Sequence, residues 1–253
     1  MPVGTEGPAG QIVLEAEPLC QESFSAFGTV VENPKPSLIP SSKISALPRN
    51  AVQANQGSAI KYQDVTHMKD LYDSAPSKEP SKAVMNMFVC AQRPLLPSQN
   101  GNLEGLFSVQ ILERHPFTTQ TFIPLGLSPS DAHRARYLVI VAPSLPPSSA
   151  DEHLPAPTYT DTSDTIQGRG LPDLTKVKAY MATGSQAVTY GAGTWHAPMV
   201  VVGEKAIDFI VVQFANGVAI EDCQEVELEK TESMLLVSVP QAGLRQSKGL
   251  WKL

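Results

Sequence analysis

Short apolar runs alternate with turn-forming residues along most of the chain, and this pattern predicts a mainly β protein. Residues 12–16, 29–32, 84–91 and 107–114 have the length and alternation of strands. Residues 136–142 are almost all apolar, as expected of a central strand that is buried on both faces. The 22 prolines and 17 glycines supply the many turns that such short strands require.

The C-terminal half continues the pattern. Residues 199–203 and 207–214 are apolar and flank Glu204 and Lys205, which predicts a hairpin. Asp208 is the only charged residue of the second run. It is expected to be either a wall of the site or a buried partner of a neighbouring histidine, and we favour the second. The main helical signal is a short stretch within residues 18–28, ended by Gly28.

Two polar stretches interrupt the apolar pattern, and each places a histidine beside a turn. Glu113 and His115 alternate, so on a strand they share one face, and Gln120 rejoins that face after a turn. His196 follows a glycine-rich turn far downstream. The four side chains together suit a divalent metal or proton transfer. The alternative for His115 is a core histidine paired with Glu113.

These positions resemble a modified cupin. The first cupin motif, G-x5-H-x-H-x3,4-E-x6-G, appears as Glu113-x-His115-x4-Gln120-x5-Gly126, with Glu and Gln in place of a His and the Glu. The second motif keeps Gly193-x-x-His196 but lacks its proline and asparagine. A narrower resemblance is to the ureidoglycolate lyase family. It rests on Glu-Arg-His-Pro at 113–116, Gln-x-Phe-Ile-Pro at 120–124, Trp-His-x-Pro at 195–198 and Asp-Phe at 208–209.

The resemblance implies a fold, a reaction and an assembly. The fold is a cupin-type double-stranded β-helix, or jelly-roll barrel, with a few short helices. The reaction is that of a carbon–nitrogen lyase of the amidine-lyase type, which cleaves ureidoglycolate to glyoxylate and urea in purine breakdown through allantoin. The family also suggests a homodimer. The rival interpretations are a non-catalytic cupin that binds a small acid and a different metal-dependent cupin enzyme.

Ureidoglycolate carries a hydroxyl, a carboxylate and the urea nitrogen on one carbon, so its lysis needs a base, an acid and a group that holds the carboxylate. His115, His196 and Glu113 are the expected catalytic residues. Gln120, Tyr190 and Lys61 are the expected substrate-binding residues. For Lys61, an exposed surface lysine is the equal alternative. His115, His196, Glu113 and Gln120 also form a possible ligand set for nickel or zinc. No organic cofactor is required.

Composition limits the remaining possibilities. The net charge is −6 and no basic tract appears, so nucleic acid is an unexpected partner. No apolar run approaches the length of a membrane span, and the N-terminus lacks the features of a signal peptide. The three cysteines are widely spaced and odd in number, which favours a reducing compartment and a cytoplasmic location.

The chain is expected to form one domain over residues 1–253. Residues 143–172 hold six prolines and many small polar residues, which predicts a loop insertion or lid. Residues 1–10 and 241–253 are expected to be loose termini. Arg114 should face away from His115, which favours a structural ion pair over a contact with substrate.

Overall fold

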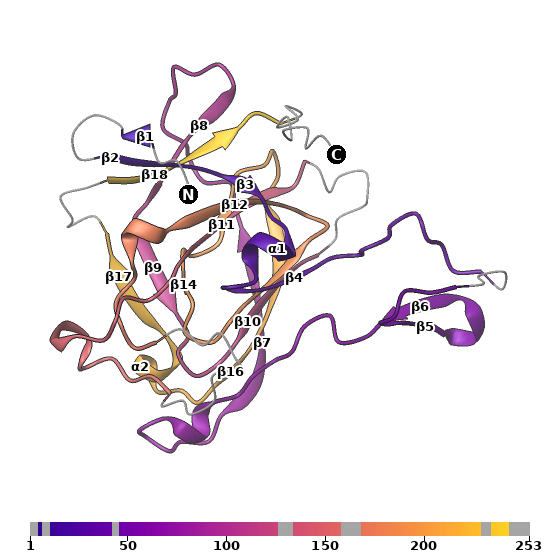
Figure 1. Ribbon diagram of the computed structural model, residues 1–253, viewed down its shortest axis with the longest axis horizontal. Helices are drawn as coiled ribbons and strands as arrows, with labels where there is room; N and C mark the ends of the chain where they lie inside the picture. The colour runs from indigo at the N-terminus through magenta and orange to yellow at the C-terminus, as the bar shows by residue number, and fades with distance from the viewer. Residues whose placement is uncertain are drawn as a thin grey trace, which may run out of the picture.

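The computed structural model describes residues 5–6, 11–41, 46–125, 134–157, 168–228 and 234–242 of the chain, and within them strands predominate (Figure 1). The helices are single turns. The α-helices are α1 (Gln21–Phe24) and α2 (Ala219–Asp222), and the 3-10 helices are η1 (Asn55–Gly57), η2 (Tyr72–Ser74), η3 (Ser149–Asp151) and η4 (Leu174–Lys176). None of the described helices has the length and apolar character needed to span a bilayer.

Three larger sheets make up the body of the protein. The four-stranded sheet has the order β1 (Thr5–Glu6), β2 (Gln11–Glu15), β18 (Met234–Pro240) and β8 (Leu103–Val109). The five-stranded sheet has the order β4 (Gly28–Val31), β13 (Ala187–Tyr190), β10 (Gln120–Pro124), β16 (Ile207–Ala215) and β7 (Lys82–Cys90). The seven-stranded sheet has the order β17 (Gln224–Glu227), β9 (Ile111–Arg114), β14 (Trp195–His196), β11 (Arg136–Ala142), β12 (Lys178–Thr183) and β3 (Glu17–Pro18), with β15 (Val200–Val201) also paired to β11.

The seven-stranded sheet is the middle layer, and strand β11 explains why. Tyr137, Val139 and Val141 pack into a core shared with the five-stranded sheet. The alternate residues Leu138 and Ile140 pack into a second core shared with the four-stranded sheet. A strand buried on both faces needs apolar residues at every position, which accounts for the continuous run predicted there. The layered arrangement is mainly β, as predicted, and is consistent with a cupin-type sandwich.

Two local predictions need correction. Residues 107–114 are not one strand, because β8 ends at Val109 and β9 begins at Ile111 in a different sheet. The predicted hairpin around Glu204 and Lys205 is wrong, since β15 pairs with β11 whereas β16 pairs with β10 and β7. In both places the chain crosses between layers within a few residues, and an apolar pattern does not reveal which sheet each run joins.

Backbone hydrogen bonds join the two ends of the predicted insertion at 143–172. The Leu145 amide donates to the Leu171 carbonyl at 2.7 Å, and the Asp173 amide donates to the Pro143 carbonyl at 2.8 Å. Gly170 allows this close approach, because a side chain there would collide with the Leu145 carbonyl. Residues 158–167 lie outside the described part. The assignment of this segment as an insertion in a single domain stays a prediction.

A separate two-stranded hairpin projects from the body (Figure 1). It consists of β5 (Ala51–Ala54) and β6 (Ala59–Tyr62), joined by the turn η1. We call residues 33–63 the arm. Of the predicted loose termini, the structure describes only residues 5–6 and 241–242.

Candidate active site

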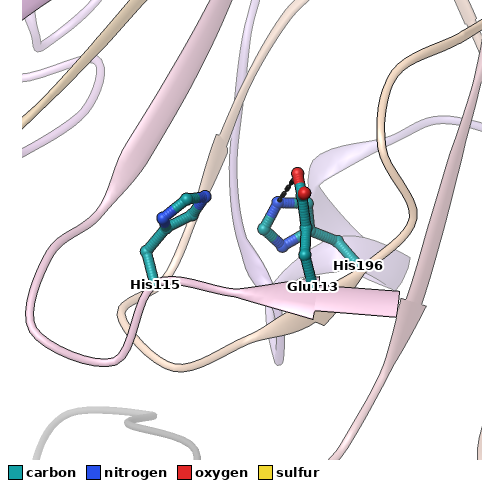
Figure 2. Close-up of side chains that lie close together, drawn as sticks. All are labelled: Glu113, His115 and His196. Atoms are coloured by element: carbon teal, nitrogen blue, oxygen red, sulfur yellow. Dashed lines mark ion pairs between the residues drawn. The ribbon is translucent and has the colours of Figure 1, made fainter. Parts of the chain in front are cut away.

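Four of the predicted polar residues come together where β9, β14 and β10 meet. Glu113 lies on β9 directly opposite His196 on β14, and His115 follows the end of β9. Gln120 opens β10 and pairs with Tyr190 of β13. Figure 2 shows Glu113 beside the His196 ring, with His115 projecting from the same side of the chain. The ring centroids of the two histidines are 5.6 Å apart.

Backbone carbonyls orient both imidazole rings. The Nδ1–H of His115 donates to the Asp222 carbonyl at 2.6 Å, and the Nδ1–H of His196 donates to the Thr194 carbonyl at 2.9 Å. A carbonyl only accepts, so each Nδ1 carries a proton and each Nε2 faces the centre of the cluster. Gly193 helps to bring the second stretch here, because its amide donates to the His115 carbonyl from a turn with φ of 75°.

The Gln120 amide joins the two rings. Its Nε2 donates to His115 Nε2 at 2.8 Å and to Gln213 Oε1 at 2.7 Å. Its Oε1 lies 3.1 Å from His196 Nε2 and can only accept. In this arrangement the Gln120 amide accepts a hydrogen bond from His196 Nε2 and donates one to His115 Nε2. Glu113 Oε1 also lies 3.5 Å from His196 Nε2.

Burial and charge set the pKa values of the cluster in a consistent way. Burial, followed by the charge of His196, lowers the pKa of His115 from 6.5 to about 4, so this ring is a neutral imidazole at pH 7. Burial alone would raise the pKa of Glu113, but the hydrogen bond and charge of His196 outweigh it and lower the value. The result is a neutral His115 imidazole near the Glu113 carboxylate.

The other predicted site residues lie in different surroundings. Tyr190 stacks on His196 with centroids 4.0 Å apart, and burial raises its pKa well above 10, so it is a protonated wall of the site. Lys61 is exposed on β6 of the projecting arm, away from the cluster (Figure 1). Asp208 is exposed and pairs with Val89 on β7, so the prediction of a buried partner for a histidine is wrong.

Arg114 faces away from the cluster, as its position in the strand predicts. Its guanidinium donates to the carbonyls of residues 168, 169 and 170 at 2.6–3.1 Å and to Gln224 Oε1 at 2.8 Å. It also lies 4.4 Å from the Trp195 ring centroid, and the Trp195 indole donates to the Gly170 carbonyl. The partners of Arg114 are carbonyl groups, in place of the predicted ion pair. The immediate neighbours of Glu113 and His196 thus hold the end of the predicted insertion.

The cluster has the donor chemistry of a metal site. Glu113, His115 and His196 offer ligand atoms that all lie within 4.8 Å of one another. Both imidazoles point Nε2 inward and use Nδ1 for a backbone carbonyl, as metal-binding histidines do. Cys223 and Glu225 lie on the outer side of Glu113. Burial and three carboxylates raise the pKa of Cys223 to about 12, so it is a thiol at pH 7 and not a nucleophile.

Comparison with known proteins places these residues in a family. Residues 11–235 match the family model described as ureidoglycolate lyase. The chain belongs to the ureidoglycolate lyase family. A protein of Schizosaccharomyces pombe named ureidoglycolate lyase is 34% identical over 224 residues, which is 88% of this chain and 94% of that protein. Proteins of the same name from Saccharomyces cerevisiae and Burkholderia mallei are 34% and 29% identical, covering 81% and 79% of this chain and 87% and 81% of their own lengths.

Membership in the ureidoglycolate lyase family agrees with the motifs at 113–116, 120–124 and 195–198. Gly126 of the first motif lies outside the described residues. Sequence reasoning missed Gln213, which orients the Gln120 amide, and Asp222, whose carbonyl orients His115. Gln213 was detectable as the one uncharged polar side chain inside the apolar run 207–214. The role of Asp222 depends on its backbone, so no residue type could have signalled it.

Proposed function

We propose that this chain is a ureidoglycolate lyase that eliminates urea from ureidoglycolate and releases glyoxylate. The observation that carries the proposal is the Gln120 amide that lies between the Nε2 atoms of His115 and His196, in a chain of this family. An acid and a base held together in this way suit a reaction that moves one proton from oxygen to nitrogen.

The proposed reaction balances with proton transfers alone. A base removes the proton of the substrate hydroxyl, the oxygen forms a carbonyl with the central carbon, and the carbon–nitrogen bond breaks. The electron pair of that bond goes to the urea nitrogen, which takes a proton from an acid. No net oxidation occurs and no covalent bond to the protein is needed.

We assign the base to His115 and the acid to His196. The Nε2 of His115 has a lone pair at pH 7, because its pKa is lowered to about 4. The proton on Nε2 of His196 is available for the departing nitrogen, and Glu113 stabilises the charged form of that ring beforehand. Gln120 releases its hydrogen bonds to the rings and donates to the substrate when the substrate enters. Exchange with water restores both protonation states.

A divalent metal, such as nickel or zinc, is the second form that we propose for this site. His115, His196 and Glu113 would hold it, with Gln120 as a neutral fourth ligand. The convergence of the three ligand atoms within 4.8 Å supports this. A bound metal ion would supply a Lewis acid for the substrate oxygens. In that form Gln213 keeps the Gln120 amide oriented, and Tyr190 covers one face of the His196 ring.

We also propose that the protein forms a homodimer through the open edge of the five-stranded sheet. Strand β7 lies at this edge, and Met85, Met87 and Val89 on it are 73%, 59% and 73% exposed. A long apolar edge strand normally pairs with another chain or is protected. Met87→Lys should shift the protein to a monomer in light scattering, whereas Ile220→Lys, on another exposed apolar surface, should not. A dimer that persists in both variants excludes this edge.

The proposal includes a cellular compartment and a metabolic role for the reaction. The three cysteines, Cys20, Cys90 and Cys223, are free, which suits a reducing compartment such as the cytoplasm. The role we propose is the step of allantoin-derived purine breakdown that releases urea.

One assay tests the reaction itself. Purified protein, with and without added nickel or zinc, is incubated with each stereoisomer of ureidoglycolate, and glyoxylate, urea and ammonia are measured together. Equimolar glyoxylate and urea without ammonia is the expected result. Ammonia without urea would move the chemistry to the amide bond, and no product from either stereoisomer would overturn the proposed activity.

A further inference from the structure

The β5–β6 hairpin of the arm projects from the body of its own chain. Figure 1 shows the β5–β6 hairpin extended away from the three stacked sheets. Hydrogen bonds form within the arm. The Gln63 amide donates to the Asn50 carbonyl at 2.7 Å, and Gln53 Nε2 donates to the Ser41 carbonyl at 3.2 Å. An isolated two-stranded hairpin is only marginally stable in water. A second surface is therefore expected to hold it in the working protein.

The composition of the arm indicates what kind of surface that is. Residues 33–63 include four basic residues and no acidic residue, in a chain whose net charge is −6. Within the described part of the arm, the apolar side chains of Ile39 and Val52 are 70% and 41% exposed. A basic segment with exposed apolar side chains complements an acidic surface with apolar patches.

The edge of the candidate active site carries carboxylates. Glu113 and Glu225 are directly opposite each other on β9 and β17, and Glu225 is exposed. The side-chain partners of His115, Gln120 and His196 in the described structure include one another, Glu113, Gln213 and backbone carbonyls. The guanidinium of Arg114 is directed to carbonyls on the other face. An anionic substrate would meet two carboxylates beside His196, so a further positive side chain would favour its binding.

We propose that the arm of one chain lies over the active site of a second copy, where Lys61 binds the substrate carboxylate. This inference rests on the proposed function, because ureidoglycolate is a carboxylate. In a two-fold dimer each chain gives one arm and receives one, so both sites are completed in the same way. The lysine ammonium is a compact, mobile charge that can follow the carboxylate during the reaction. The arm also brings positive charge beside Glu113 and Glu225.

Mixing two impaired variants, assayed at a substrate concentration below the wild-type KM, tests this assignment directly. Lys61→Ala has an intact cluster but lacks the arm lysine, and His196→Ala has an intact arm but lacks the acid. If the arm acts on the partner, mixed dimers contain one complete site, and an equal mixture after subunit exchange regains about a quarter of wild-type activity. If Lys61 acts on its own chain or not at all, the mixture stays at the activity expected from the separate variants, which overturns the proposal.

A chemical cross-link tests the placement of the arm without using activity. In a Cys20→Ser, Cys90→Ser, Cys223→Ser background, the two substitutions Lys61→Cys and Glu225→Cys are bridged by a short bis-maleimide. Glu225 marks the site because it is exposed and lies directly opposite Glu113. The expected product has the mass of two chains and is absent when Glu225 is left in place. A product of single-chain mass, or none, would contradict an arm placed over the partner's site.

The two tests separate the inference from the proposed function. If the cysteine variant forms the dimeric cross-link but wild-type protein does not turn over ureidoglycolate, the function fails and the placement of the arm stands. In active protein, Lys61→Ala should raise KM more than tenfold with a smaller effect on kcat, and Lys61→Arg should recover part of the loss. Lys35→Ala removes the same charge from the arm outside the hairpin and should leave KM unchanged. If Lys61→Ala and Lys35→Ala raise KM equally, the effect comes from the overall charge of the arm, and the specific role of Lys61 is overturned.

Discussion

The polar cluster around His196 and the β5–β6 arm differ in how their side chains are held. In the cluster, His115 and His196 are 7% and 1% exposed, and each ring nitrogen has a partner. On the arm, Lys61 is exposed on a hairpin that projects from the body. The acid–base groups are thus preorganised within one chain, whereas the group proposed to capture the substrate anion is not. Burying a charged group costs free energy, and the fold of one chain holds the buried groups in place. In our proposal the solvated charge of Lys61 comes from a second copy of the chain.

The largest effect is expected from removing the acid. His196→Ala should lower kcat by roughly 10²–10⁴-fold, the usual contribution of a positioned acid or base. The measurement is steady-state kinetics with urea and glyoxylate detection, and circular dichroism serves as the control for folding. A variant with normal kcat would exclude His196 from the chemistry.

Next in size is the loss of the buried guanidinium behind the cluster. Arg114→Met leaves three backbone carbonyls and Gln224 without their donor, and should lower the free energy of unfolding by about 2–4 kcal/mol. Arg114→Lys keeps the charge but not the forked donor geometry, so it should restore only part of this. Urea unfolding gives both values. Equal stability of all three proteins would show that the clamp is not a structural requirement.

The lowered pKa of His115 predicts a dependence of stability on pH. In the unfolded chain its pKa is near 6.5, and in the folded protein it is about 4, so between these values the unfolded state binds more protons. Stability should be complete above pH 6.5 and fall as the pH decreases toward 4, by up to ~1.4 kcal/mol per pH unit. The measurement is urea unfolding of chelator-treated protein at several pH values. In His115→Gln this part of the slope should be absent, and an unchanged slope would assign it to other groups.

A smaller effect is expected at Gln213, which only orients the Gln120 amide. Gln213→Leu removes the acceptor that holds the Gln120 Nε2, so the amide can turn its oxygen toward His115. We expect a decrease in kcat of about tenfold, corresponding to one lost hydrogen bond near 1.4 kcal/mol. Gln213→Glu keeps an acceptor and should stay closer to wild type. Unchanged kcat in the leucine variant would show that Gln120 orients itself.

The smallest effect on stability is expected on the arm. Lys61→Ala should change the free energy of unfolding by no more than about 0.5 kcal/mol, because the side chain is exposed. The main effect of Lys61→Ala is expected on KM, through weaker substrate binding. A loss of stability comparable to that of Arg114→Met would remove the contrast between the two regions and make the arm a structural element.

Much of the candidate site was predictable because it depends on local geometry. The alternation of Glu113 and His115 determines that they share a side and that Arg114 faces the other. The incorrect predictions share a different cause. Asp208 and the supposed hairpin around Glu204 and Lys205 depend on which sheet a strand joins, and strands of the same apolar character enter different layers.

The sequence by itself determined the mainly β class, the strand periodicity and the residue types of the cluster, because side-chain alternation and turn formation act over a few residues. Only the tertiary structure decided that β9 and β14 pair so that Glu113 faces His196, that the Asp222 carbonyl orients His115, and that the Gln120 amide lies between the two imidazoles. Those features require contacts between segments distant in the chain. Burial then converts the contacts into the shifted pKa values on which the proposed chemistry depends.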